Sequence, residues 1–379
     1  MDKKKIIMLA YIAAISQSFH SCGGDDKVIT VPEPVSYVAL APGENLLSPT
    51  RVHETENNCE FPFGGDGGKN LFFIIKEKST GFRNVYRKDQ PLNLSVSQLT
   101  GGHCFHSAPS YCAALQKVAF AGRLNEATLA DIYLVNSIKG GALTQVTNTP
   151  DYEEDYPCFS KDGKVIVYQK RLRTASVKNT EIWLKNLQTN ETTQLELGCH
   201  PTISPDGRKI AFIKYSNDNY VTCLFVVNID GTNLTQLTDA GFGIVSRPCF
   251  SPDGGKIVFE CSRPHKEDYD IYSIDINGNN LEQLTINNSY DGEPYWSNDG
   301  FIYFTSDRGG KAKHFQIWRF KKSGGTITTT SDTKTHTVQS GETITTIARK
   351  YGVTVRDIVK WNKLNTMTIN AGMKLIVSQ

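Results

Sequence analysis

The sequence predicts an all-β six-bladed propeller followed by a small α+β module with the element order βααβ. A unit of about 46 residues recurs through the middle of the chain, and a turn motif and a strand-end motif keep that spacing. The last stretch, residues 336–379, changes to helical spacing. With 379 residues the chain is long enough for one large domain and one small one.

The first 21 residues are typical of a secretion signal. Lysines at residues 3–5 precede an apolar run that ends near Phe19 and is too short to span a bilayer as a stable helix. The Phe-His-Ser-Cys sequence at residues 19–22 then resembles a bacterial lipobox. That resemblance implies cleavage before Cys22 and lipidation of its thiol, so that acyl chains hold the mature protein at a membrane surface. The alternative is an ordinary signal peptide with an incidental cysteine.

We expect residues 22–35 to be a tether and residues 36–325 to form the propeller. Its repeats are marked by a tight turn, spelled Ser-Pro-Asp-Gly where it ends at Gly207 and Gly254, with related Asp-Gly turns at Gly163 and Gly300. Proline presets φ, aspartate tolerates the next turn position, and glycine takes positive φ without steric cost. Alternating apolar residues follow each turn, which predicts a strand with one buried face.

A second landmark closes each repeat. Glutamine followed by Leu or Val recurs at Gln98, Gln145, Gln194, Gln236 and Gln283, and four of these five pairs are followed by threonine. Another apolar strand lies between the two landmarks, so each unit supplies four short strands. A lone four-stranded unit leaves its faces uncovered, and radial stacking of such units predicts a propeller with protected edges.

Six units can be counted between about residue 59 and residue 325. The segment from Gly43 to Thr50 aligns at equal spacing with the outer-strand segment from Gly231 to Thr238, which predicts that the N-terminal segment completes the last blade. The alternative is an outer strand from residues 326–330. These repeats resemble those of TolB-like propellers and of prolyl oligopeptidase relatives, a resemblance that implies the fold and leaves the function open.

Residues 326–335 form a Thr/Ser-rich stretch that we expect to be a flexible linker. Beyond it, Ile344, Ile347, Ala348 and Tyr351 recur at helical spacing. A second helix is expected near residues 354–359, and strand-like segments flank the pair. This order predicts a separate βααβ module over residues 336–379.

The tail resembles the LysM family closely. The matching segments are Thr-Val-Gln-Ser-Gly-Glu-Thr from Thr337, Tyr-Gly-Val from Tyr351, Trp-Asn from Trp361 and Ile-Asn-Ala-Gly from Ile369. The family usually has Tyr at the position of His336 and Asp at that of Glu342.

The LysM resemblance implies recognition of peptidoglycan or another N-acetylglucosamine-containing glycan in a shallow groove between two loops. A groove of backbone donors and acceptors with small apolar contacts suits N-acetyl sugars. Carried over by position, the glycan-binding residues are Ser340, Gly341, Glu342, Thr343, Ile344, Ile369, Asn370, Ala371 and Gly372.

Other motifs give little support for catalysis or for a cofactor. His103 and His106 bracket Cys104 at a spacing seen in metal sites, but no second pair of ligands lies at a zinc-site interval, so we expect no metal. The acidic run at residues 151–155 is expected to be a solvated loop, with a cation or basic partner near the axis as the alternative. No Gly-x-Ser-x-Gly elbow occurs, so no catalytic residue is predicted.

Eight cysteines remain after Cys22, which in an exported protein invites disulfides. Cys158 and Cys249 occupy the same repeat position, Pro-Cys-Phe-Ser, which favours small buried residues on inner strands. We expect free thiols, with one or two bridges as the alternative.

Together these features predict a non-enzymatic lipoprotein of the outer membrane that faces the periplasm, with surface exposure as an alternative. The tail would bind peptidoglycan, and the propeller would bind a protein partner. Nucleic acid is a poor partner because the formal net charge is only +2 and the charges are interspersed. The alternative function is a glycan- or peptidoglycan-processing enzyme or accessory with a site at the propeller axis.

Overall fold

The computed structural model divides the chain into two compact units, Met1–Lys322 and Ser323–Gln379. In the first unit it describes residues 49–53, 55–89, 95–101, 105–123, 129–216, 221–262, 269–286, 289–308 and 313–321. In the second it describes residues 335–339, 341–344, 346–347, 358, 362, 364 and 369–377. The predicted signal peptide, the tether and Cys22 lie outside the described residues. Within these ranges, no helix is long and apolar enough to cross a membrane.

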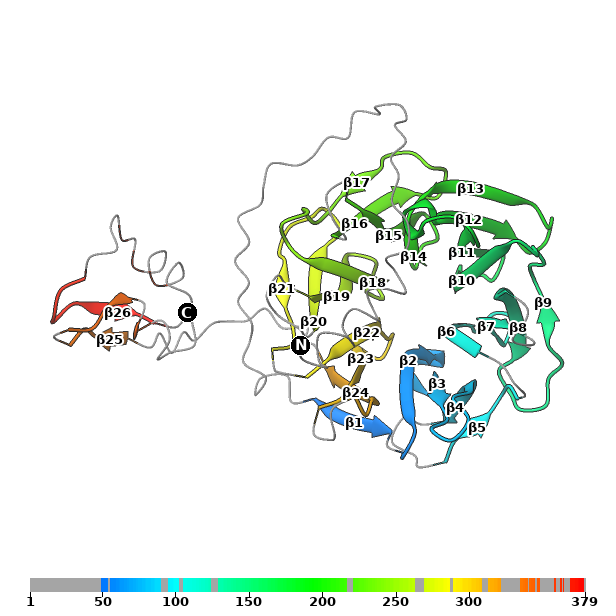
Figure 1. The fold of residues 1–379 in the computed structure, drawn as a ribbon, viewed down its shortest axis with the longest axis horizontal. Coiled ribbons are helices and arrows are strands. Elements are labelled where there is room, and N and C mark those ends of the chain that lie inside the picture. Colours follow the sequence, from blue (N-terminus) through cyan, green and yellow to red (C-terminus); the bar gives the residue numbers. More distant parts are fainter. Residues whose placement is uncertain are drawn as a thin grey trace. The chain divides into compact units, whose positions relative to one another are not determined.

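The first unit is built from six antiparallel four-stranded blades around a common axis (Figure 1). Blades one to three are β2 (Asn58–Gly65), β3 (Asn70–Lys76), β4 (Arg83–Asp89) and β5 (Ser97–Gln98); β6 (Phe105–Cys112), β7 (Lys117–Arg123), β8 (Asp131–Asn136) and β9 (Thr144–Gln145); and β10 (Tyr152–Phe159), β11 (Val165–Leu172), β12 (Glu181–Asn186) and β13 (Thr192–Leu197). Blades four and five are β14 (Cys199–Ile203), β15 (Lys209–Tyr215), β16 (Thr222–Asn228) and β17 (Thr235–Gln236); and β18 (Ile244–Phe250), β19 (Lys256–Ser262), β20 (Asp270–Asp275) and β21 (Glu282–Gln283). A single parallel pair, Thr222 with Ile244, joins blades four and five into one hydrogen-bonded sheet.

The sixth blade combines strands from both ends of the propeller. It contains β22 (Asp291–Trp296), β23 (Phe301–Ser306), β24 (Gln316–Lys321) and, as its outer strand, β1 (Thr50–His53). The prediction that an N-terminal segment completes the last blade is therefore confirmed. The strand lies later in the chain than the alignment of Gly43 to Thr50 indicated, and residues before 49 are outside the described part.

The Ser-x-Asp-Gly turns form as their residue types predict. In the turn that ends at Gly207, the hydroxyl of Ser204 donates to Asp206 (2.6 Å) and accepts from the backbone N–H of Lys209 (2.9 Å). Gly207 has φ 73°, a left-handed conformation that favours glycine. These bonds hold inner and second strands of the blade in one register.

The threonine that ends each Gln-Leu-Thr motif explains why the outer strands are short. The hydroxyl of Thr147 accepts the backbone N–H of Ile132 at 2.8 Å, and Thr238 accepts that of Leu224 at 2.9 Å. The side chain thus satisfies a donor of the third strand that would otherwise need a longer outer strand. Blade three has Glu196 where blades one, two, four and five have threonine, and its outer strand β13 extends over six residues.

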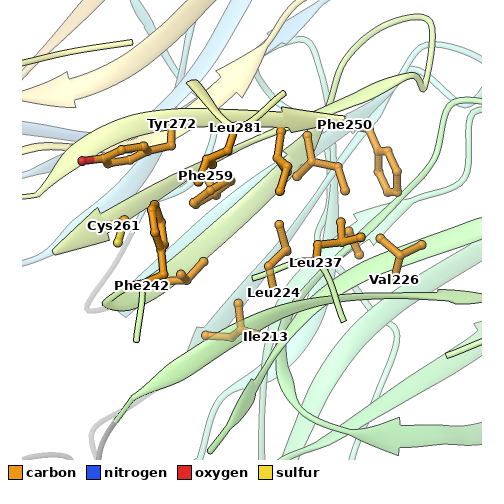
Figure 2. Close-up of a cluster of buried hydrophobic side chains, with 14 of the residues drawn as sticks. Ile213, Leu224, Val226, Leu237, Phe242, Phe250, Phe259, Cys261, Tyr272 and Leu281 are labelled. Carbon is orange, nitrogen blue, oxygen red and sulfur yellow. The ribbon is translucent and has the colours of Figure 1, made fainter. Parts of the chain in front are cut away.

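Buried apolar clusters fill every interface between neighbouring blades in the described part of the propeller. Figure 2 shows the one between blades four and five, where Ile213 and Leu224 meet Phe259 and Tyr272. The cluster between the last and first blades joins Tyr303 to Leu71 and other residues of β2 and β3. The expectation that neighbouring units stack to cover each other's faces is confirmed.

The second unit has its own small core. Its strands β25 (Thr335–Thr337) and β26 (Lys374–Ile376) pair antiparallel. Ile344, Ile347 and Ile358 are buried with strand residues such as Leu375. Helical hydrogen bonds join Ile347 to Thr343 (3.0 Å) and Asn362 to Ile358 (3.1 Å), while the remainder of both predicted helices and Trp361 lie outside the described residues.

Candidate functional site

The propeller axis is lined by a ring of six backbone bulges, one on the inner strand of each blade. Each bulge consists of a non-glycine residue with positive φ followed by a buried proline, and the register of the strand shifts there. The residue–proline pairs are Phe61-Pro62, Ala108-Pro109, Tyr156-Pro157, His200-Pro201, Arg247-Pro248 and Glu293-Pro294. Proline lacks an N–H donor and therefore interrupts the ladder, and bulges of this kind redirect side chains. Left-handed backbone at a non-glycine residue costs on the order of 1–3 kcal/mol, and such strain concentrates at binding sites.

The bulges surround a cavity of about 100 Å³ at the axis. All six residue–proline pairs line it, together with the residues that follow five of the prolines: Phe63, Cys158, Thr202, Cys249 and Tyr295. A second cavity of about 160 Å³ shares these five side chains and extends toward the Ser-x-Asp-Gly turns. The shared side chains separate two small chambers along the axis.

One side of the ring is polar and is organised by Arg247. Its Nη1 donates to Glu260 at 2.7 Å and to the Tyr290 hydroxyl at 3.2 Å, and its Nη2 lies 3.7 Å from Oε1 of Glu293. Its Nε donates to the hydroxyl of Tyr156, from blade three, at 3.4 Å. The guanidinium therefore connects blades three, five and six at the axis.

Glu293 is held by two further hydrogen bonds. Its Oε2 accepts the backbone N–H of Phe61 at 2.6 Å and the hydroxyl of Thr305 at 2.7 Å. The first of these bonds crosses from the last blade to the first. It also satisfies a backbone donor at the bulge itself.

The other side of the ring is aromatic. The Tyr156 and His200 rings lie 4.2 Å apart, Phe61 meets Tyr156 edge-on at 6.2 Å, and the guanidinium of Arg247 lies 5.2 Å from the centre of the Phe61 ring. Phe63 and Tyr295 pack at 4.3 Å below them. A group bound here would meet aromatic faces on one side and a charged pair on the other.

Burial controls the ionisation of the axial groups. It raises the pKa of Glu260, and the nearby Arg247 opposes this shift. Burial, with a further contribution from Arg247, holds the pKa of His200 well below its ordinary value. The His200 imidazole is therefore neutral near pH 7, with Nδ1 3.0 Å from the Ser246 hydroxyl.

The two predicted glycan-binding loops are brought together in the second unit. Gly372 donates its N–H to the carbonyl of Val338 at 2.8 Å, and Val338 donates to Met373 at 2.8 Å. The second loop is thus joined to the strand end from which the first loop starts. Asn370 and Ala371 lie in the turn before these bonds and are exposed.

Eight of the nine predicted glycan-binding residues fall into three groups. Gly341, Thr343, Asn370, Ala371 and Gly372 are exposed. By contrast, Ile344 is only 4% exposed and Ile369 packs against the same core, so these two side chains support the loops from within. Ser340 lies outside the described residues.

Glu342 is half-buried and occupied by internal bonds. Its Oε2 accepts the backbone N–H of Gln339 at 2.7 Å and lies 2.6 Å from Nε2 of the buried His336. The two positions at which the tail differs from the LysM pattern therefore contact each other. Glu342 holds the first loop in shape.

One of two further expectations, that for the acidic run at residues 151–155, can be compared with the structure. The acidic run is not a solvated loop: Tyr152–Phe159 is the inner strand β10, where Glu153 pairs with Arg123 and the fully buried Glu154 lies 3.3 Å from Lys170. The density of charge in this segment indicated a loop. The segment can nevertheless form a strand, because partners on other strands neutralise its charges. His103 and Cys104 lie outside the described residues.

The described residues contain no group of three or more His, Cys, Asp or Glu side chains arranged to hold a metal ion. No disulfide joins any two of the seven described cysteines, in agreement with the expectation of thiols. Cys158 and Cys249 lie on inner strands, half-buried against both axial cavities. Burial raises the pKa of Cys249 to about 12, which makes its thiol a poor nucleophile.

Sequence reasoning missed the axial ring. Its signal was the spacing of six prolines, Pro62, Pro109, Pro157, Pro201, Pro248 and Pro294, which keep the period of the turn motif. A proline inside a predicted strand indicates an edge or a bulge. The residues before these prolines differ in every blade, which is why comparison of the repeats passed over them.

Comparisons with known proteins agree on the propeller. A sequence model described as the TolB beta propeller domain matches residues 192–372, a range that runs past the last propeller strand, β24, into the second unit. TolB from Acinetobacter baumannii superposes with a TM-score of 0.55 at 19% identity, over 69% of this chain and 65% of that one. A putative TolB from Agrobacterium tumefaciens gives 0.53 at 22% identity, over 72% and 93%.

Two further similarities concern enzymes. An oligogalacturonate lyase in complex with manganese superposes with a TM-score of 0.50 at 17% identity, over 72% of this chain and 92% of that one. At these identities the structural likeness concerns the fold alone. "Probable endopeptidase p60" of Listeria innocua is 49% identical over 45 residues, 12% of this chain, and the match spans only 10% of that protein.

The family match and the solved structures, together with the six blades described above, show that this chain contains a TolB-like β-propeller domain.

Proposed function

We propose that this protein is a non-enzymatic cell-envelope lipoprotein that binds peptidoglycan, or another N-acetylglucosamine-containing glycan, through residues 336–379. The propeller would serve as a platform for a protein partner. Lipid on Cys22 would hold the protein at the outer membrane, facing the periplasm. No cofactor is required for this role.

The observation that carries the glycan proposal is the junction of the two loops at Val338 and Gly372. Exposed small residues and backbone groups from both loops, at Gly341, Thr343 and Ala371, lie at the surface there. N-acetyl sugars present amides, a methyl group and few charges, and they suit a shallow surface with such groups. The 45-residue similarity to a probable endopeptidase has about the length of this module.

The platform proposal is supported by the TolB-like fold and by the axial ring. The ring residues have a strained, positive-φ backbone that presents aromatic and charged side chains around a cavity. The similarity to TolB structures supports a protein partner.

The alternative is an enzyme that processes glycans at the axis. His200, Arg247 and Glu293 gather there, and an oligogalacturonate lyase shares the fold. Against it, Arg247 and Glu293 are engaged by protein groups, and His200 is a neutral, poorly basic imidazole. Turnover of muropeptides or oligogalacturonates by the purified protein would establish the alternative and contradict the binding role.

Retention on purified sacculi tests the wall-binding role. Ala371→Trp places a bulky side chain at the exposed junction of the loops without touching the core, whereas Thr337→Trp places the same side chain on an exposed position of β25. We expect Ala371→Trp to reduce retention at least tenfold and Thr337→Trp to leave it near the wild-type level. Equal retention of all three folded proteins would contradict the proposal.

The location has separate tests. Cys22→Ala should move the protein from the membrane fraction to the soluble fraction. Protease shaving of intact cells should spare the protein if it faces the periplasm and should degrade it if it is surface-exposed.

A further inference from the structure

The open edge of the Arg247–Glu293 pair is the most specific feature of the axial cavity. Nη2 of Arg247 and Oε1 of Glu293 lie 3.7 Å apart, farther than a direct hydrogen bond. The other nitrogens of Arg247 and the other oxygen of Glu293 are already used. Among the described residues, no hydrogen bond reaches either of the two facing atoms, so one donor and one acceptor stand side by side at the cavity.

A planar primary carboxamide matches this edge. Its oxygen and its nitrogen lie on one side of the group, and two hydrogen bonds of about 2.9 Å diverging from them reach a donor and an acceptor at this separation. The same bidentate geometry lets Asn and Gln read neighbouring donor and acceptor atoms of adenine. In a trans secondary amide, such as a peptide bond or an N-acetyl group, the N–H and C=O point in opposite directions and cannot use both atoms.

Charge also favours a neutral ligand. Arg247 lies between the carboxylates of Glu293 and Glu260, and the Glu260 side chain is 2% exposed. A carboxylate entering the cavity would approach two carboxylates, and an ammonium group would approach the guanidinium. A carboxamide satisfies both atoms and adds no charge to a buried site.

The size of the cavity limits what can enter. About 100 Å³ accommodates one side chain, and it is smaller than the engineered cavity of about 150 Å³ that binds benzene. The rings of Tyr156 and Phe61 flank the polar pair and offer apolar faces to a planar group. A sugar ring or a folded loop does not fit this space.

We propose that the axial cavity binds the side chain of an asparagine or glutamine presented by an extended segment of a partner protein. This inference rests on the proposed role of the propeller as a protein-binding platform and names the chemistry of that site. Arg247 and Glu293 recognise the carboxamide, and the aromatic side of the ring packs on its plane.

The test uses the full chain and a set of short peptides blocked at both ends as N-acetyl and N-methylamide, so that the ends carry no primary carboxamide. The peptides are identical except for one central residue: Gln, Asn, Glu, Lys or Leu. Binding is measured by ligand-observed NMR. The Gln or Asn peptide should bind at least about tenfold more tightly than the Glu, Lys and Leu peptides, a difference of 1.4 kcal/mol.

Ala108→Phe provides the blocking variant, because Ala108 lines the cavity from blade two, whereas Arg247 and Glu293 belong to blades five and six. In the folded variant, shown by an unchanged thermal midpoint, binding of the Gln peptide should disappear. Glu293→Gln, which keeps the shape of the site, should weaken the preference for carboxamide over the other side chains.

Two results would overturn the inference in different ways. Equal binding of all five peptides, abolished by Ala108→Phe, would remove the carboxamide assignment and leave the axis as a peptide-binding site, so the platform role would stand. Peptide binding that survives Ala108→Phe, or no binding of any peptide, would remove the axis as the site altogether.

Discussion

Replacing Arg247 by leucine would leave two buried carboxylates without their cation. Glu260 is 2% exposed and Glu293 is 8% exposed, and both belong to the ion-pair cluster of Arg247. Breaking a buried pair by removing one partner costs about 3–5 kcal/mol, because the remaining charge stays buried. We therefore expect Arg247→Leu to lower the free energy of unfolding of the propeller by about that amount.

Urea unfolding followed by circular dichroism measures this loss. Lys214→Leu is the matched control, since Lys214 pairs with Glu196 at 3.2 Å with both side chains more than a fifth exposed. Such a pair contributes about 0–1 kcal/mol. Adding Glu260→Gln to Arg247→Leu should restore part of the stability, because it removes one of the two unpaired charges.

The Arg247→Leu deficit should also depend on pH. Burial already raises the pKa of Glu260, and loss of the guanidinium raises it further. Acidification toward that raised pKa protonates the carboxyl and removes the buried charge, so the deficit should shrink as pH falls. If the Arg247→Leu and Lys214→Leu variants unfolded at the same urea concentration, the proposal that Arg247 compensates the buried carboxylates would be refuted.

Two further predictions concern the blades. Burial, with a smaller contribution from a nearby lysine, lowers the pKa of His53 to about 4, below its ordinary 6.5. The neutral ring therefore contributes its full share to the free energy of unfolding above pH 6.5, and this share should fall by up to about 3 kcal/mol as the pH drops toward 4. His53→Gln should flatten this part of the stability–pH curve, as measured by chemical denaturation. Thr147→Val removes the hydroxyl that accepts the Ile132 N–H at 2.8 Å and should cost about 1–3 kcal/mol in urea unfolding, whereas Thr189→Val, at an exposed turn, should cost less than about 0.5 kcal/mol; equal losses would contradict the role assigned to the strand-end threonine.

The fold could be predicted from sequence because its rules are local and repeated. Three of the four Ser-x-Asp-Gly turns close through bonds that span five residues, as between Ser204 and Lys209, and the fourth closes over four residues, from Ser297 to Phe301. The threonine of each Gln-Leu-Thr motif acts on a strand about 14 residues earlier, as Thr238 does on Leu224. Spacing alone therefore predicts the strands and the number of blades.

The axial site could not be predicted in the same way, because its contacts are long-range. Arg247 reaches Tyr156, 91 residues away, and Glu293 bonds to the backbone of Phe61 across 232 residues. A repeat pattern shows that these positions are equivalent but not that six different side chains meet there. The same limit explains why Ile344 was assigned to the glycan surface, since family position does not distinguish a loop side chain from one that turns into the core.

Titration of chitin oligosaccharides, (GlcNAc)4 to (GlcNAc)6, into the full chain and into a chain that ends at Lys322 tests the central claim most directly. That boundary separates the two compact units, so the propeller keeps all of its strands. We expect calorimetric binding by the full chain and none by the shortened protein. Binding of equal affinity by both proteins, or by neither, would contradict the assignment of glycan recognition to the tail.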